Sequence, residues 1–253
     1  RADAQPAVPV SVPVGKIVSI HAQRTQVRRL LDDSSPADAP TAYYALFHDP
    51  ARSALFTQAD DRGRVTGFVA VCQTGIDLFR PLLTLQCPNA DCAAALLGQA
   101  LKAGRPYILF ARVNQLPLVS DVLRLDNHRI LHILRLDPRR FQPVINVLAR
   151  SETAHDGTPR CVIESGGVQA VAGVNWQSPA FAEVFVHTDP ALRERGLGTS
   201  VAAGVTQAVL QSGRIPLYLV EDGNGPSRNI AESLGYVDTG VRQVYADAVY
   251  SGQ

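Results

Sequence analysis

Membrane and secretion signals are absent from this 253-residue sequence. No apolar run approaches the roughly 20 residues that a membrane-spanning helix needs. The first residues also lack a basic segment followed by an apolar one, which is the pattern of a secretory signal. We therefore expect a cytoplasmic protein that makes no membrane contact.

An excess of charge of either sign is also missing. The chain has 24 Lys and Arg residues against 23 Asp and Glu residues, which gives a net charge of +1. The basic residues are scattered, whereas nucleic-acid binding that depends on counterion release needs them clustered. With 46% hydrophobic and 19% charged residues, the composition is that of an ordinary globular protein. We expect small molecules or single proteins as partners, and no nucleic acid.

Cysteine is scarce, and its spacing does not indicate a metal site or a disulfide framework. The four cysteines lie in apolar or strand-like segments, without a Cys-x-x-Cys pair and without a nearby histidine: Cys72, Cys87, Cys92 and Cys161. We interpret them as buried free thiols, and we expect no metal.

One segment has a strong local pattern. Residues 186–199 read VHTDPALRERGLGT, a short apolar strand that leads through an Arg-x-x-Gly-x-Gly turn into a helix. Gly196 and Gly198 lack a Cβ, so the main chain can approach a pyrophosphate closely. Arg193 and Arg195 add positive charge where the helix dipole already favours an anion. Taken alone, the pattern is equally compatible with an ordinary tight turn.

The segments that follow favour the phosphate interpretation. Apolar residues recur at helical spacing after Gly198, and Gly213 ends that predicted helix. A buried strand is predicted from Ile215, and a second helix from Asn224 to Gly235. The Walker lysine and the dinucleotide-type glycine pattern are both absent, which argues against those phosphate-binding families.

In this order, the segments resemble the GNAT superfamily of acetyl-CoA-dependent N-acyltransferases. The resemblance rests on residues 186–199, on the strand 216–220, on Asn224-x-x-Ser227 and on Leu234-Gly235-Tyr236. It implies acetyl-CoA as the acyl-donor substrate, with the main chain of a splayed strand pairing with the pantetheine arm and the glycine loop binding the pyrophosphate. The residues that it assigns to the cofactor are Val186, Thr188, Arg193, Glu194, Arg195, Gly196, Leu197, Gly198, Thr199, Asn224 and Ser227.

Amide formation needs a base, because an amine with a pKa of about 10.4 is protonated at neutral pH. Glu183 lies close to where some GNAT members carry a carboxylate base, and strand alternation places it on the same side as His187. A solvated or paired strand glutamate is an equally open interpretation. His187 is a second candidate base, or a surface histidine at a strand end. The family often has a tyrosine seven residues after the asparagine, where this chain has Ala231.

The order of predicted elements indicates two related halves. We predict an α/β protein with mixed, mostly antiparallel sheets: an extended tail at 1–14, a degenerate GNAT-like unit at 15–136 and an acetyl-CoA-binding GNAT unit at 137–253, each sheet flanked by helices. The first unit is degenerate because its strand-to-helix turn, residues 87–92, has no glycine and no arginine. Residues 130–136 and the apolar run 141–148 are alternatively the first strand and helix of the second unit.

The individual elements follow from periodicity. In the first half we expect helices at 18–31, 91–103 and 116–125 and strands at 43–47, 53–58, 65–73, 82–87, 107–111 and 130–136. In the second half we expect strands at 161–164, 168–176, 182–187 and 237–249, in addition to the strand and the two helices named above.

The sequence leaves two classes of function open. The first is an N-acetyltransferase that passes the acetyl group directly to the primary amine of an acceptor. The second is a non-catalytic acyl-CoA-binding or regulatory module, which the missing tyrosine and the degenerate first half favour. A generic nucleotide-binding protein is a third and weaker alternative.

Overall fold

The computed structural model describes residues 19–75 and 77–252, so the predicted tail at 1–14 lies outside the described residues. The first half contains α1 (Ile20–Val27), α2 (Ala39–Ala42), β1 (Ser53–Ala59), β2 (Val65–Cys72), β3 (Leu82–Gln86), α3 (Ala90–Ala100), β4 (Pro106–Arg112), α4 (Leu116–Val119) and β5 (Leu123–Leu136). The second half contains β6 (Arg150–Thr153), β7 (Pro159–Ser165), β8 (Val168–Gln177), β9 (Phe181–Thr188), α5 (Leu197–Gln211), β10 (Ile215–Glu221), α6 (Gly225–Ser233) and β11 (Tyr236–Tyr250).

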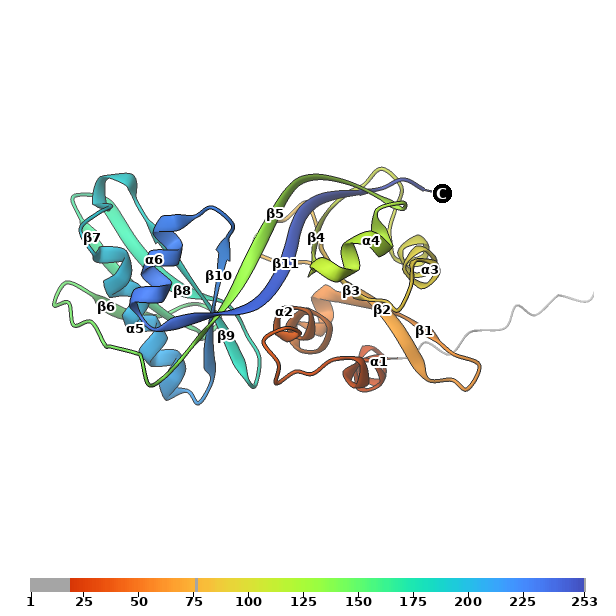
Figure 1. Cartoon of the computed structure of the whole chain (residues 1–253), viewed down its shortest axis with the longest axis horizontal. Helices are drawn as coiled ribbons and strands as arrows, with labels where there is room; N and C mark the ends of the chain where they lie inside the picture. The colour runs from red at the N-terminus through yellow and green to blue at the C-terminus, as the bar shows by residue number, and fades with distance from the viewer. Residues whose placement is uncertain (1–18, 76, 253) are drawn as a thin grey trace, which may run out of the picture.

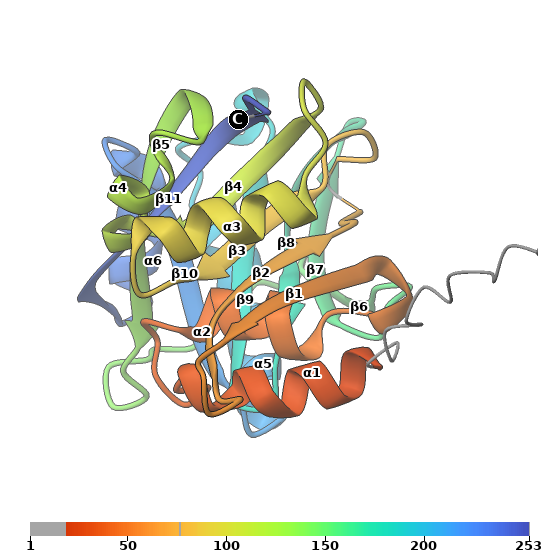
Figure 2. The ribbon, with the colours of Figure 1, turned by 90° about the vertical axis from the view of Figure 1, so that its right-hand side faces the viewer.

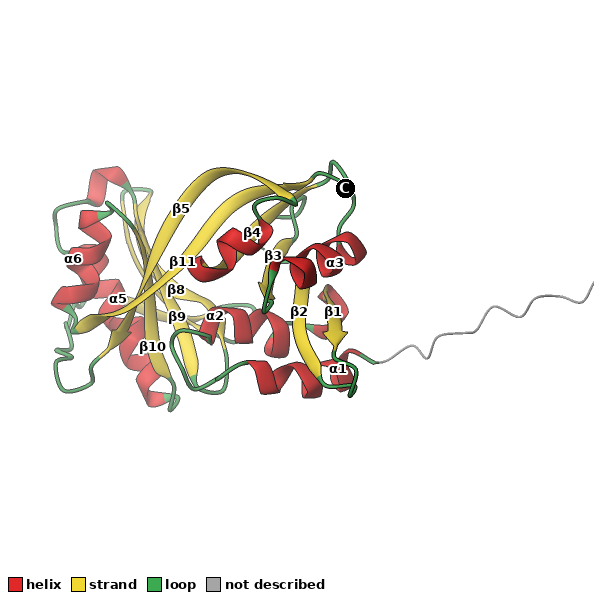
Figure 3. Ribbon diagram, turned by 45° about the vertical axis from the view of Figure 1, so that its right-hand side comes forward, coloured by secondary structure: helices red, strands yellow, loops and turns green. Residues whose placement is uncertain are grey.

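The described strands form one sheet in the order β1-β2-β3-β4-β11-β5-β10-β9-β8-β7-β6. The pairing is mostly antiparallel, and the exceptions are the parallel pairs β3–β4 and β9–β10. Helices α5 and α6 cover one face of the second half, and α3 crosses β2, β3 and β4 in the first half (Figures 2 and 3). This mixed sheet with flanking helices confirms the predicted fold class.

The two halves exchange their last strands. Strand β5 lies between β10 and β11, and pairs with β10 over residues 131–135. Strand β11 lies between β5 and β4, and its far edge pairs with β4 over residues 243–249. The two long strands therefore run side by side through the middle of the molecule (Figure 1). Each half of the sheet is completed by a strand from the other half.

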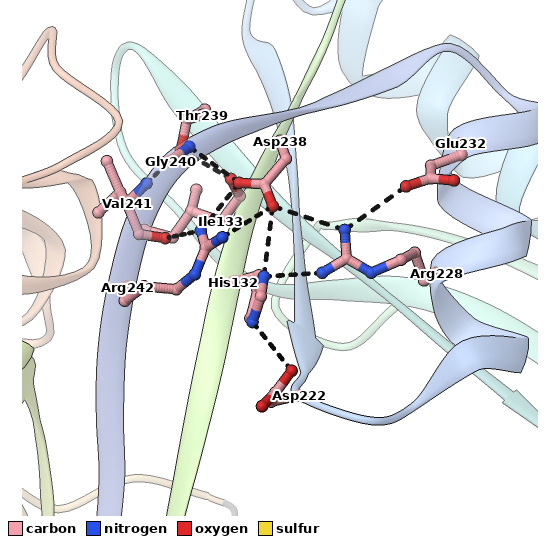
Figure 4. A network of polar contacts seen from close by, with 10 residues as sticks. All are labelled: His132, Ile133, Asp222, Arg228, Glu232, Asp238, Thr239, Gly240, Val241 and Arg242. Carbon is pink, nitrogen blue, oxygen red and sulfur yellow. Dashed lines mark hydrogen bonds and ion pairs between the residues drawn. The ribbon is translucent and has the colours of Figure 1, made fainter.

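A network of hydrogen bonds and ion pairs links β5 and β11 where they run side by side (Figure 4). Asp238 on β11 accepts hydrogen bonds from Arg242 at 2.9 and 3.0 Å and from the Gly240 N–H at 2.8 Å. His132 on β5 lies 3.3 Å from the same carboxylate and 2.7 Å from Nη2 of Arg228 on α6. The network thus joins both exchanged strands to the helix that covers them.

Both halves contain a pair of parallel strands that diverge. Strands β9 and β10 pair only from Phe181–Val184 to Ile215–Tyr218. The pairing of β3 with β4 is shorter still and involves residues 82 and 83 of β3. Beyond these contacts the ends of β9 and β3 are free of their parallel neighbours, so each half has a gap at the same place in its topology.

The structure differs from the expected secondary structure at several places. The run 43–47 is a π-helical turn that continues α2, because Pro40 starts a helix there and the apolar side chains pack in the core of the first half. The predicted helix 116–125 ends at Val119, since residues from Leu123 onward pair with β11. The apolar run 141–148 forms no helix, and the short strand β6 was not predicted.

Candidate active site

A cavity of about 810 Å³ opens where β9 diverges from β10. Its lining comes from β9, from the loop before α5, from the first turn of α5 and from the start of α6. The residues are Val186, His187, Thr188, Leu192, Arg193, Glu194, Gly196, Leu197, Gly198, Thr199, Tyr218, Asn224, Pro226, Ser227, Asn229 and Ile230. The structure therefore brings together the residues that the sequence assigned to the cofactor, with one exception. Arg195 is exposed and does not line the cavity.

The loop before α5 lines this cavity and leads into a helix without a side-chain cap. Glu194 and Gly196 adopt left-handed backbone conformations, with φ of 63° and 70°. Gly196 is the N-cap residue of α5 and has no side chain with which to bond the first N–H groups of the helix. The first turn of α5 also lacks an acidic residue. Free N–H groups and the positive end of the helix dipole make this an anion-binding position.

Gly198 packs closely against Thr188 and Ile230, so α5 approaches β9 and α6 at this point. A Cβ at Gly198 would lie 3.0 Å from both Oγ1 of Thr188 and Cδ1 of Ile230. The hydroxyl oxygen of Thr188 is buried and has no hydrogen-bond partner among the described residues. Buried hydroxyls are normally hydrogen-bonded, so this one fits a position that a bound polar chain would satisfy.

The start of α6 forms the opposite wall. Oδ1 of Asn224 accepts a hydrogen bond from the Ser227 N–H at 3.1 Å, so Asn224 caps the helix. The Ser227 hydroxyl donates to the Tyr218 hydroxyl at 3.3 Å. Sequence reasoning missed Tyr218, a buried phenol of β10 that lines the cavity. The available signal was a tyrosine in an otherwise aliphatic strand, since a buried tyrosine needs a polar partner.

Glu183 lies on the face of β9 opposite to the α5 core. The residue is 9% exposed, and Nδ2 of Asn175 donates a hydrogen bond to its carboxylate at 2.9 Å. Burial raises the pKa of Glu183 to about 7, against the opposing effects of Asn175 and Trp176. The Glu183 side chain does not line the cavity.

His187 is the second candidate base, and it does line the cavity. Its side chain is 61% exposed, and Nε2 lies 3.5 Å from Oδ1 of Asp189. Ala231, at the position where the family often has tyrosine, is fully buried in the core. Tyr236 is also a core residue, and its hydroxyl lies 2.8 Å from that of Thr206.

The equivalent gap in the first half is closed by a side chain of the protein itself. Gln115 follows β4, is 3% exposed, and its Oε1 accepts a hydrogen bond from the Cys87 N–H at 2.8 Å. Asn89 caps α3 by accepting from the Cys92 N–H at 2.9 Å. In the first half, the main-chain N–H groups of Cys87 and Cys92 are thus hydrogen-bonded to side chains of the protein.

The four cysteines are free and buried, as predicted. Burial raises the pKa of each thiol, to about 11 for Cys72. Reactive cysteines have lowered pKa values, so these thiols fit a packing role. Within residues 19–75 and 77–252, no group of three His, Cys, Asp or Glu side chains is placed to hold a metal ion. The helices of this part of the chain are all too short or too polar to cross a membrane.

Comparisons with known proteins agree with this geometry. Residues 163–245 match the FR47-like protein family model. No curated protein matches the sequence. A putative acetyltransferase of the GNAT family from Novosphingobium aromaticivorans is similar in structure, with a TM-score of 0.56, 18% identity, and coverage of 72% of this chain and 88% of that chain.

Two further solved structures span nearly the whole chain. A tandem GNAT protein from the clavulanic acid biosynthesis pathway has a TM-score of 0.58 and 14% identity, over 93% of this chain and 98% of that one. A GCN5-related N-acetyltransferase from Sphaerobacter thermophilus has a TM-score of 0.59 and 11% identity, over 92% and 94%. The resemblance to the GNAT superfamily is thereby confirmed, by the family model over residues 163–245 and by the fold of the chain. These findings support acyl transfer as the class of reaction.

Proposed function

We propose that this protein is an N-acetyltransferase that transfers an acetyl group from acetyl-CoA to a primary amine of its acceptor. The observation that carries the proposal is the cavity between β9 and α6, because it combines an anion-binding loop with a free strand edge. The loop 193–199 binds the pyrophosphate, and the main chain of Val186 and Thr188 pairs with the pantetheine arm. Asn224 and Ser227 contact the arm from α6.

In the proposed reaction the amine nitrogen attacks the thioester carbonyl carbon directly. A C–N bond forms, the C–S bond breaks, and the proton of the attacking amine passes to a base of the protein. Glu183 is the preferred base, because a carboxylate with a pKa of about 7 is poised for proton transfer near neutral pH. His187 is the alternative base. The thiolate leaves without a tyrosine at position 231, since a thiol with a pKa near 8.5 is a tolerable leaving group.

The organisation that we propose keeps the predicted boundaries, with a first GNAT-like unit at 15–136 and a second at 137–253. The closed gap at Gln115 supports a structural or substrate-gating role for the first unit. The tail at 1–14 remains a prediction.

The second candidate function is a non-catalytic acyl-CoA-binding module. It is favoured by Ala231 at the tyrosine position and by the engagement of Asn224 as a helix cap. The two functions differ in turnover and agree in binding, so binding alone does not separate them.

Thiol release with a panel of primary amines separates the two functions. For an enzyme we expect amine-dependent release of CoA, loss of turnover in Glu183→Gln, and unchanged acetyl-CoA binding in that variant. A His187→Asn variant tests the alternative base in the same assay. Binding of acetyl-CoA without amine-dependent release for any amine supports the binding module and contradicts the enzyme.

A further inference from the structure

Strand β8 contains a β-bulge directly beside Glu183. Val174 of β8 pairs with Val184 of β9, and the next pair along the strands is Trp176 with Glu183. Two residues of β8 thus span one step of β9, and Asn175 is the inserted residue.

The bulge changes which face the following side chain occupies. Ala170, Ala172 and Val174 all contribute to the core beneath α5. Regular alternation would place Trp176 on that same face. Because Asn175 is inserted, Trp176 packs instead with Phe181 in the cluster on the other face. The carboxylate of Glu183 therefore meets an indole and an amide from one bulge.

Asn175 is an exposed residue whose side chain is hydrogen-bonded to a buried carboxylate. Glu183 is 9% exposed, whereas Asn175 is an exposed residue, and its Nδ2 lies 2.9 Å from Oε1 of Glu183. A buried carboxylate without hydrogen-bond donors takes up a proton, and a proton-bearing carboxyl is no longer a base. The donor from Asn175 acts against that protonation.

We propose that Asn175 is the positioning residue of the reaction, which holds the Glu183 carboxylate in its ionised form and fixes its orientation for the incoming amine. This inference rests on the proposed function, in which Glu183 is the base. The β-bulge is the structural device that brings the amide to the carboxylate.

Two other side chains lie beside Glu183. Leu217, its register partner on β10, offers no hydrogen-bond donor. The indole of Trp176 also lowers the Glu183 pKa, but it is retained in the Asn175 variants, so these variants measure the effect of the Asn175 amide alone. Tyr44, from the π-helical turn 43–47, is the titratable group that interacts with Glu183. Burial raises the pKa of Tyr44 well above its usual value, so this phenol stays neutral across the pH range of an assay.

The first measurement is a carbon-13 NMR titration of glutamate side-chain carboxyls in the full chain, without substrate. The Glu183 signal is identified by its absence in Glu183→Gln. We expect Asn175→Ala to raise the Glu183 pKa by about one unit, through loss of a charge-assisted hydrogen bond. The near-isosteric Asn175→Asp should raise it further, because it places a second negative charge beside the carboxylate.

A matched control is available in the first half. Nδ2 of Asn127 donates to the Asp247 carboxylate at 2.7 Å, and Asn127 has a left-handed backbone with φ of 52°. Asn127→Gly removes that amide without backbone strain and should leave the Glu183 pKa unchanged.

The second measurement is the pH dependence of kcat with an active amine. We expect the acidic limb of the Asn175→Ala profile to move up by about the same unit as the Glu183 pKa, with activity recovered at high pH. An unchanged Glu183 pKa in both Asn175 variants overturns the inference. So does a fall in kcat that is equal at all pH values, because that is the signature of a structural defect.

The two measurements also separate this inference from the proposed function. The NMR titration needs no turnover, so it gives a result even if no amine is acetylated. If the Asn175 variants shift the Glu183 pKa but no amine is acetylated, the proposed acetyltransferase function is contradicted. The effect of the Asn175 amide on the ionisation of Glu183 is then still supported. Full turnover by Glu183→Gln overturns the positioning role, whatever the titration shows.

Discussion

The side-chain carbonyl of Gln115 accepts a hydrogen bond from the main-chain N–H of Cys87, 2.8 Å away. Gln115 follows β4 and precedes Leu116-Pro117 at the start of α4, just as Asn224 follows β10 and precedes Gly225-Pro226 at the start of α6. The two residues therefore occupy equivalent places in the two halves. In the first half the longer side chain spans the gap and closes it, whereas in the second half the gap remains a cavity.

Replacing Gln115 tests whether this closure is structural. Gln115→Leu leaves the buried Cys87 N–H without its acceptor, so we expect the free energy of unfolding to fall by about 1–3 kcal/mol. Denaturant unfolding measures this change. The stoichiometry of acetyl-CoA binding to the wild-type protein should be one per chain. A second equivalent bound by the wild-type protein would show that the first half is open.

Gly198 gives a direct test of the cavity. A Cβ there lies 3.0 Å from the Thr188 hydroxyl and from Ile230, so Gly198→Ala should narrow the site and weaken acetyl-CoA binding by about tenfold or more. Gly225→Ala is a matched control at the start of α6, because a Cβ at Gly225 meets no atom within 4 Å. Equal affinity in the two variants, measured by calorimetry, would contradict the assignment of the loop.

The ionised Glu183 carboxylate should lower the stability of the folded protein near neutral pH, although turnover needs it as the base. Its pKa in the folded protein rises from 4.5 to about 7, so the protonated form stabilises the fold below about pH 4, and this stabilisation is lost as the pH rises through about 7. Glu183→Gln has no such loss. We therefore expect the stability of the variant relative to wild type to increase by about 2–3 kcal/mol between pH 4 and pH 8.

Thermal and denaturant unfolding at both pH values check this expectation, and thiol release measures the accompanying loss of turnover. A variant that is less stable than wild type by the same amount at both pH values would mean that the carboxyl does not change its ionisation.

The strand crossing should depend on Asp238. Burial alone would raise the pKa of this carboxyl, but hydrogen bonds from Arg242, Gly240 and His132 outweigh it and hold the pKa well below its usual range. The ionised form therefore contributes stability above about pH 4, and this is lost as the pH falls further. Asp238→Asn should cost about 1–2 kcal/mol at pH 7, a value reduced because the carboxylate is partly exposed.

Unfolding of wild type and Asp238→Asn at pH 7 and at pH 3 measures this difference. The gap between the two proteins should narrow at pH 3, and a gap that is equal at both pH values would contradict the ionic role of Asp238.

The local features of the site could be predicted from the sequence, because they depend on residues close together in the chain. The spacing of Gly196 and Gly198 predicts a tight turn before a helix, and helical periodicity locates α5 behind it. The same reasoning fails at residues 43–47, where a short apolar run fits a strand or a helical turn equally well.

The features that the sequence did not reveal depend on contacts between distant residues. Periodicity predicts a strand at 130–136, but it does not say that this strand lies between β10 and β11. The bulge at Asn175 is equally hidden, because one inserted residue changes the register without a mark in the composition. Gln115 was missed for the same reason, since its partner Cys87 lies 28 residues away.

In the proposed function, the loop 193–199 and the cavity beside it bind acetyl-CoA. Calorimetric titration of acetyl-CoA into the wild-type protein and into an Arg193→Glu/Gly196→Asp/Gly198→Asp variant, whose folding is verified by circular dichroism, tests it most directly. We expect one site per chain in the wild-type protein and none in the folded variant. Absence of binding by the folded wild-type protein, or equal binding by the variant, would contradict it.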